Sequence, residues 1–159
     1  MAWWNGDGTT DDSTGTNQVT LLGGNNYAPG KVGLGFEFKG YTNFARIAAS
    51  PSLNVGSSPG FTIEGWIYPK DVAAFHPILE WNNGVQGGVL GTHFWIGHLP
   101  SSNGELFANI VDTAGTSHPF WSANGIVAAN AWQHIALTYD KASGMAQILR
   151  NGLVIAQAS

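Results

Sequence analysis

Two stretches of the sequence decide the fold: Phe61-Thr62-Ile63-Glu64-Gly65-Trp66-Ile67-Tyr68-Pro69 and Trp132-Gln133-His134-Ile135-Ala136-Leu137-Thr138-Tyr139-Asp140. Both are rich in β-branched and aromatic residues. The first ends in a proline, and the second is followed by Gly144 and then by Asn151-Gly152. Each stretch therefore predicts a strand of an antiparallel β-sandwich.

Short apolar runs broken by Gly, Asn or Pro recur along the whole chain, and no long window has apolar residues at helical spacing. The chain is therefore expected to be all-β, and so many runs suit two packed sheets better than one flat sheet. The expected strands are Trp3–Trp4, Val19–Leu22, Leu34–Phe38, Phe44–Ala48, Phe61–Tyr68, Ile78–Trp81, His93–Gly97, Leu106–Asp112, Pro119–Trp121, Trp132–Tyr139, Met145–Arg150 and Leu153–Gln157.

Turn and alternation signals add detail to these strands. Asn151-Gly152 accepts the positive φ angles of a type I′ turn and predicts a hairpin of the last two strands. Apolar residues occur at both alternating positions from Trp132 to Tyr139, which predicts a central strand covered on both sides. Trp66 and Trp132 are expected in the core. The segment 5–18, rich in Asp, Gly and Thr, predicts a loop.

Composition limits the partners of the chain. Its 159 residues, expected to form a single domain over 1–159, include 6 basic and 10 acidic ones, and the formal charge is −4. Without a cluster of Lys and Arg, neither nucleic acid nor a basic membrane-surface helix is expected. No apolar run approaches the ~18 residues of a membrane span. There is no cysteine, which excludes disulfides and thiolate zinc sites, and a surface of Gly, Asn, Ser and Thr favours neutral ligands.

Further motifs accompany the two decisive stretches in a fixed order: Trp3-Trp4, Asp11-Asp12-Ser13-Thr14-Gly15, Ala28-Pro29-Gly30-Lys31-Val32-Gly33 and Phe36-Glu37-Phe38-Lys39-Gly40. As a set they resemble the laminin G-like jelly-roll domains of the concanavalin A-like lectin and glucanase superfamily, as found in bacterial extracellular proteins. The resemblance implies a two-sheet antiparallel β-sandwich. It also implies binding of a glycan or a surface protein, at a secreted or cell-surface location.

Two departures from the family pattern affect these expectations. Residues 39–44 lack the carboxylates that the family usually has there, which argues against a metal site in this loop. The sequence also stops at Ser159, after the Asn-Gly hairpin, where similar domains continue through further strands. We therefore expect that the last family strands are absent and that the sequence is a piece of a larger precursor. Another copy of the chain or a further segment is expected to complete the edge of the sheet.

The ionisable residues form no catalytic or zinc motif. Glucanases need paired carboxylates on one strand face, but each glutamate here is alone in its segment, so no enzyme is expected. His93 and His98 would face opposite sides of a continuous strand, and His134 is expected as a hydrogen-bonded core residue. A structural calcium ion stays open as an alternative to a simple turn, because oxygen ligands are available in one loop from Asp7, Asp11 and Asp12.

Aromatic residues beside amides and imidazoles are candidate sugar contacts. A sugar ring packs its apolar C–H face on an indole, and its hydroxyls pair with polar side chains. For every Trp the alternative is burial in the core. The candidate contacts are stacking by Trp81, Trp95 and Trp121, with Asn82, Asn83, His93 and His118 fixing orientation.

Two functions follow from the sequence. The first is a non-catalytic extracellular recognition module that binds neutral carbohydrate. The alternative is a structural or adhesion module that contacts other proteins or assembles with itself through exposed edge strands.

Overall fold

The computed structural model describes residues 1–24, 27–40, 42–82 and 90–159. Their contacts divide them into two compact units, Met1–Ser57 and Ser58–Ser159, and each unit is described by itself. The single domain expected over 1–159 stays a prediction.

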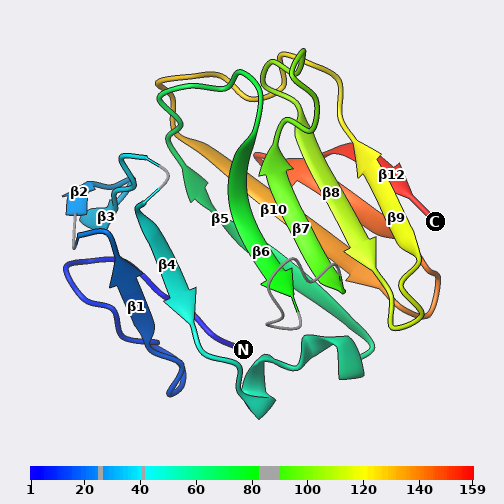
Figure 1. The fold of residues 1–159 in the computed structure, drawn as a ribbon, viewed down its shortest axis with the longest axis horizontal. Coiled ribbons are helices and arrows are strands. Elements are labelled where there is room, and N and C mark those ends of the chain that lie inside the picture. Colours follow the sequence, from blue (N-terminus) through cyan, green and yellow to red (C-terminus); the bar gives the residue numbers. More distant parts are fainter. Residues whose placement is uncertain (25–26, 41, 83–89) are drawn as a thin grey trace. The chain divides into compact units, whose positions relative to one another are not determined.

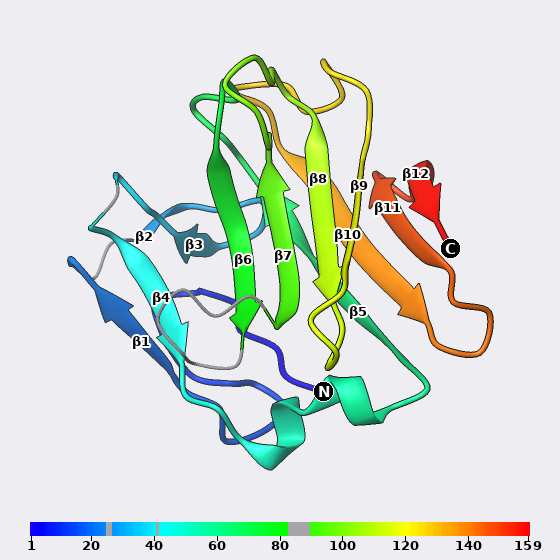
Figure 2. The same cartoon turned by 45° about the vertical axis from the view of Figure 1, so that its right-hand side comes forward.

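The all-β prediction is confirmed, because antiparallel strands build both units (Figure 1). The second unit has two four-stranded sheets, ordered β6-β7-β8-β9 and β12-β11-β10-β5, which lie as two layers (Figure 2). The strands of this unit are β5 (Gly60–Ile67), β6 (His76–Asn82), β7 (Gly91–Ile96), β8 (Leu106–Val111), β9 (Ser117–Trp121), β10 (Gln133–Asp140), β11 (Ala146–Arg150) and β12 (Leu153–Ala158).

The core of the second unit lies between its two sheets. Phe94 of β7 and Leu106 of β8 pack there with Ile135, Leu137 and Ile148 of the opposite sheet, and each of the five is at most 1% exposed. Strand β7 alternates buried and half-buried residues along its length. Because successive side chains of a strand point to opposite faces, the second face of β7 is directed outward.

Strand β10 pairs with β5 and β11, as expected of a central strand. Its two faces are covered unequally: Ile135 and Leu137 are buried, whereas on the opposite face Ala136 is buried and its neighbours His134 and Thr138 are half-buried. Trp66 pairs with His134 in the sheet and is 50% exposed. The predictions of Trp66 and His134 as core residues are therefore wrong, because the register places both on the outward face. Trp132, half-buried, packs against Tyr68 at 5.3 Å between ring centroids.

The predicted Asn-Gly hairpin is confirmed. Asn151 and Gly152 have φ angles of 49° and 81° and connect β11 to β12. Asn151 also ties this turn to β10, since its N–H donates to the His134 carbonyl (2.8 Å) and its Oδ1 accepts the His134 N–H (2.9 Å). The turn thus fixes three neighbouring strands of one sheet.

The first unit contains two small antiparallel pairs and two short 3-10 helices. β1 (Val19–Leu22) pairs with β4 (Phe44–Ile47), and β2 (Tyr27–Pro29), which the sequence does not predict, pairs with β3 (Leu34–Phe36). The helices are η1 (Pro51–Leu53) and η2 (Val55–Ser57). The other predicted strands, Trp3–Trp4 excepted, are confirmed within two residues at either end.

The predicted strand at Trp3–Trp4 is wrong. The backbone N–H of Trp3 donates to Asp12 Oδ1 at 2.9 Å, and the indole N–H of Trp4 donates to the Asn17 carbonyl at 2.5 Å. Both residues therefore stabilise the loop expected at 5–18, which is confirmed as irregular, and neither belongs to a sheet.

One buried amide secures the chain entering β10. Gln133 is 1% exposed, and its Nε2 donates to the carbonyls of Ala128 (2.8 Å) and Ala131 (3.2 Å). Its Oε1 accepts the Ala128 N–H and Arg150 Nε, both at 3.0 Å. A buried polar side chain with all its partners satisfied specifies one conformation of the segment 128–133.

We expect Gln133→Ala to lower the free energy of unfolding by about 3 kcal/mol, because it leaves several buried polar groups without partners. Denaturant unfolding followed by circular dichroism measures the change. Gln147→Ala is the matched control, because within the described residues the Gln147 side chain bonds only the exposed Gln157 (3.2 Å). We expect it to change the free energy of unfolding by at most about 0.5 kcal/mol. Equal effects of the two changes would contradict this role of Gln133.

Candidate functional site

The register of β6–β9 determines which side chains point away from the core. Phe94, Ala108 and Phe120 lie in one cross-strand row and are buried. The neighbouring row, Trp95, Phe107 and Trp121, therefore points outward. The outward face of this sheet is the candidate site.

A glycine adds a histidine to this face. Gly97 has a φ of 75°, and a Cβ on it would lie 1.8 Å from the Ala74 carbonyl oxygen, so only glycine fits. Strand β7 ends at Ile96, and the His98 ring lies 5.0 Å from that of Phe107 and 4.5 Å from that of Trp121. Because the strand does not continue to His98, the alternation expected between His93 and His98 does not apply.

Five rings form a continuous row across this sheet, and we call it the aromatic row. The centroid of Trp95 lies 6.4 Å from that of Phe75 and 6.3 Å from that of Phe107, and both pairs are edge-to-face. His98 then stacks on Phe107 with 11° between the ring planes, and Trp121 follows at 32° to His98. The aromatic row comprises Phe75, Trp95, Phe107, His98 and Trp121.

The ends of the aromatic row are its most accessible parts. Phe75 is 43% and Trp121 50% exposed, whereas the three rings between them are half-buried. A shallow groove of the same unit lies elsewhere, at the ends of β5 and β10, and is lined by residues such as Phe61, Thr62, Thr138, Tyr139 and Gln147. The aromatic row is thus an open surface suited to an extended ligand.

Glu80 holds two side chains of the candidate site. Its Oε2 lies 2.7 Å from His93 Nδ1, and its Oε1 accepts the indole N–H of Trp95. Glu80 and His93 are cross-strand partners on β6 and β7. One carboxylate therefore fixes the orientation of both rings.

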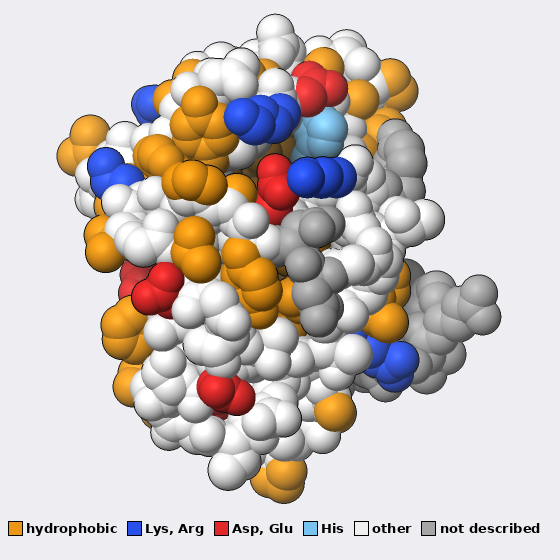
Figure 3. Space-filling view, turned by 90° about the vertical axis from the view of Figure 1, so that its left-hand side faces the viewer, with side chains coloured by type: hydrophobic (Ala, Val, Ile, Leu, Met, Phe, Trp, Pro, Cys, Tyr) orange, Lys and Arg blue, Asp and Glu red, His pale blue; other side chains and the backbone are white. Residues whose placement is uncertain are grey.

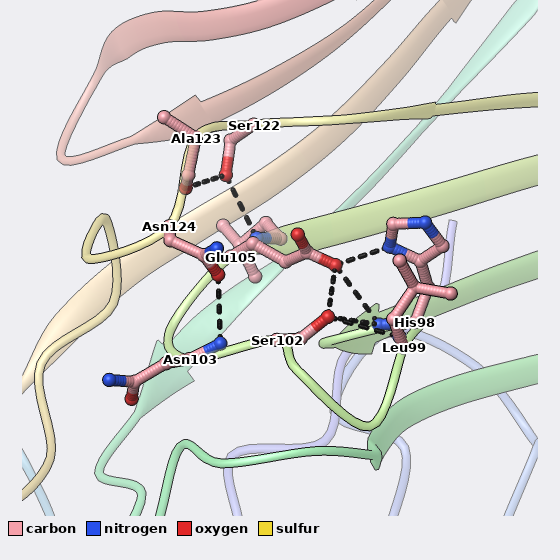
Figure 4. Close-up of polar contacts among 9 residues, drawn as sticks. His98, Leu99, Ser102, Asn103, Glu105, Ser122, Ala123 and Asn124 are labelled. Atoms are coloured by element: carbon pink, nitrogen blue, oxygen red, sulfur yellow. Dashed lines mark hydrogen bonds and ion pairs between the residues drawn. The ribbon is translucent and has the colours of Figure 1, made fainter.

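A buried carboxylate supports the other end of the aromatic row (Figure 4). Glu105 is 5% exposed, and its Oε1 accepts the Ser102 hydroxyl (2.7 Å), the His98 N–H (3.0 Å) and the His98 Nδ1. Burial alone would raise the pKa of this carboxyl, but the hydrogen bonds and the positive charge of a protonated His98 outweigh it and hold the pKa below its ordinary value. Glu105 is therefore ionised at neutral pH.

Each of the five histidines lies within 4 Å of a carboxylate, and the five carboxylates are different residues. Glu64 is 3.8 Å from His134, Asp71 is 3.8 Å from His76, and Asp112 is 3.5 Å from His118; the remaining two pairs are those of Glu80 and Glu105. Among residues 1–24, 27–40, 42–82 and 90–159, no group of three His, Cys, Asp or Glu side chains fits a metal ion.

The predicted sugar contacts divide between the two faces of β6–β9. His93, Trp95 and Trp121 share the outward face, and Asn82, paired with Gly91, lies at its end. Trp81 and His118 occupy the register of the buried Thr92, on the opposite face. Asn83 lies outside the described residues. The structure thus brings four of the predicted side chains to one face and separates two from them.

Sequence reasoning did not identify Phe75, Phe107, His98, Glu80 and Glu105 as parts of this face. Phe107 alternates with Leu106 and Ala108, a signal that it faces away from them. Gly97, one residue before His98, indicates where the strand stops. The pairing of Glu80 with His93 leaves no signal in the sequence, because it depends on cross-strand register.

The three aspartates proposed for calcium do not form one site. Asp12, 7% exposed, accepts five hydrogen bonds from Trp3, Thr14 and Asn17. Asp11 accepts the Thr9 hydroxyl at 2.6 Å, and Asp7 accepts the Leu34 N–H at 2.9 Å. Because the Asp12 oxygens already face donors, the residues present do not fit a calcium ion.

The family of the chain comes from a comparison with known proteins. The model of a family described as the concanavalin A-like lectin/glucanases superfamily matches residues 38–159. The motifs before residue 38 lie outside this range. No curated protein matches the chain.

We expect Asp12→Asn to lower the melting temperature at neutral pH, and we expect this difference to shrink in acid. Hydrogen bonds lower the pKa of the Asp12 carboxyl far below its ordinary value. The largest effect comes from the Trp3 N–H, and Asn17 and Thr14 add to it against the opposing effect of burial. A lowered folded-state pKa gives stability that is complete above the ordinary value of about 3.9 and is lost as the pH falls below it.

Thermal unfolding at pH 7 and pH 2.5 measures this effect, with Asp11→Asn as the control on the exposed neighbour. A difference between wild type and Asp12→Asn that stays constant between the two pH values would contradict the role of the Asp12 charge.

Proposed function

Since the chain belongs to the concanavalin A-like lectin/glucanases superfamily, we propose that it is a non-catalytic recognition module that binds neutral carbohydrate on the outward face of β6–β9. The family suggests a carbohydrate- or protein-binding module, and its laminin G-like domains are generally non-catalytic. The carbohydrate itself and the site are our proposal.

The aromatic row is the observation that carries this proposal. Aromatic faces and edges pack against the apolar C–H groups of sugar rings. The row runs from Phe75, directly before β6, over β7, β8 and β9. Two strand spacings from β7 to β9 amount to about 10 Å. Phe75 extends the row by a further 6.4 Å between ring centroids, so the row is long enough for several consecutive sugar rings. The proposed contacts are those of the aromatic row together with His93 and Asn82.

The charge distribution supports a neutral ligand. On the face drawn in Figure 3, acidic and basic side chains lie near one another in the upper part and singly below, without a patch of one sign. Charged residues make up 10% of the chain. Within the candidate site, Glu80 and Glu105 are each paired with a histidine. Such a surface offers no field that would attract a polyanion such as nucleic acid.

The environments of the two carboxylates support binding without catalysis. A glycosidase needs one carboxyl group as acid and a second as base or nucleophile at the scissile bond. Glu80 already accepts from Trp95 and contacts His93, and Glu105 is buried beneath His98. Neither carboxylate is arranged to meet a substrate bond.

The proposed location is outside the cell, secreted or at its surface, in a larger precursor. Laminin G-like domains are often extracellular. In the described ranges, the helices lack the apolar length that a bilayer crossing requires.

The outward face of the other sheet favours a second candidate function, contacts with proteins or with a second copy. Trp66 and Val154 are 50% and 47% exposed there, and Leu153 in the edge strand β12 is 72% exposed. Among the described residues no strand pairs with the outer edge of β12. Exposed apolar side chains beside such an edge suit β-augmentation.

We expect Trp121→Ala to weaken binding to neutral polysaccharides by at least about tenfold, since it removes the most exposed indole of the aromatic row. Native gel electrophoresis in β-glucan, galactomannan or starch measures the affinity from the retarded migration. Trp66→Ala is the matched control, because Trp66 is equally exposed on the other sheet.

Two results would count against the proposal: no retardation of the wild type by any of the polysaccharides, or equal loss of binding in both variants. Concentration-dependent assembly that Trp66→Ala alone abolishes would favour the second candidate function.

A further inference from the structure

The His98 ring contacts two aromatic rings and one carboxylate. Phe107 from β8 stacks on it at 5.0 Å between ring centroids, and Trp121 from β9 lies at 4.5 Å with 32° between the ring planes. Glu105 contacts the Nδ1 of the ring. Within the described residues, Glu105 is the one ionisable group found in contact with this ring. His98 therefore links a buried carboxylate to an exposed indole.

Glu105 is itself firmly placed. The Ser102 hydroxyl that donates to it also accepts the N–H groups of His98 (3.2 Å) and Leu99 (3.0 Å), so the turn between β7 and β8 closes around the carboxylate (Figure 4). Charge-assisted hydrogen bonds are about twice as strong as neutral ones. The buried Glu105 thus fixes the position of the half-buried His98.

We propose that Glu105 is a positioning residue of the binding face: it fixes the His98 imidazole, and this ring fixes the Trp121 indole in the orientation that a ligand meets. The inference rests on the proposed carbohydrate site. It adds that the most exposed contact of the site is ordered before a ligand arrives.

The other indole of the row is held in a related way. Glu80 accepts the N–H of Trp95 directly, whereas Glu105 acts on Trp121 through the stacked imidazole. A side chain ordered in advance loses less rotational freedom when it binds, so its contact contributes more to affinity. Trp121, half exposed at the end of the row, needs this support most.

The first test uses the free protein. The indole N–H resonance of Trp121, assigned by its loss in Trp121→Phe, reports the mobility of this ring by nuclear magnetic resonance relaxation. We expect a rigid indole in the wild type and a mobile one, with an order parameter below about 0.6, in Glu105→Gln and in His98→Leu.

Glu64→Gln is the matched control for this test. On the other sheet, Glu64, His134 and Trp66 repeat the same sequence of carboxylate, imidazole and indole, with 3.8 Å from Glu64 to His134 and 5.4 Å between the two rings. We expect the Trp121 resonance and its mobility to be unchanged in Glu64→Gln.

The second test measures affinity for β-glucan, galactomannan and starch. We expect Glu105→Gln to weaken binding about threefold and His98→Leu about tenfold, with Glu64→Gln unchanged. Circular dichroism confirms that each variant is folded, and His98→Leu serves alone if Glu105→Gln does not fold.

A Trp121 indole that stays rigid in Glu105→Gln and His98→Leu overturns the positioning role, whatever the protein binds. A wild type that binds none of the polysaccharides overturns the proposed function, and the mobility measurement still decides whether Glu105 orders Trp121.

Discussion

The antiparallel register of β6–β9 is the constraint on which the rest of the structure depends. The core of the second unit must bury Phe94, Ala108 and Phe120 in one row, and cross-strand pairing then forces Trp95, Phe107 and Trp121 into the next row on the opposite face. A shift of one residue in any of these strands would exchange the two rows. The same hydrophobic burial that stabilises the sandwich therefore places Trp95, Phe107 and Trp121 of the aromatic row, and the segments beside β6 and β7 add Phe75 and His98.

The glutamates of the second unit hold rings. Its three glutamates each contact a histidine. His98 contacts Trp121 and His134 contacts Trp66, whereas the third tryptophan, Trp95, donates directly to Glu80. Exposed ion pairs contribute little to stability, so most of these contacts matter for orientation more than for the free energy of unfolding. Glu105 differs from the others because it is buried, and its hydrogen bonds join the turn after β7 to the surface. An open face that must meet a flat ligand gains from rings that are ordered beforehand.

Local patterns predicted most of the strands, because alternation and turn residues act over a few positions. Asn151-Gly152 is the clearest case, since the positive φ angles of the turn are a property of these two residues. Trp66 and Trp3–Trp4 show the limit of such patterns. Burial of Trp66 depends on which face of β5 meets the other sheet. Trp3 and Trp4 hydrogen-bond to the loop that contains Asp12, and the periodicity of the sequence gives no sign of these bonds. For the same reason the sequence identified His93, Trp95 and Trp121 as candidates but also Trp81 and His118, which lie on the other face.

The sequence by itself determined the fold class, the positions of most strands, the Asn-Gly hairpin and the family, because these follow from residue types and their local order. Only the tertiary structure decided which side chains meet. Glu80 and His93 are 13 residues apart, and His98 and Trp121 are 23 apart, so their contacts exist only after strands have paired in one register and Gly97 has ended β7. The aromatic row is therefore a property of packing, since only the folded sheet brings its five rings together.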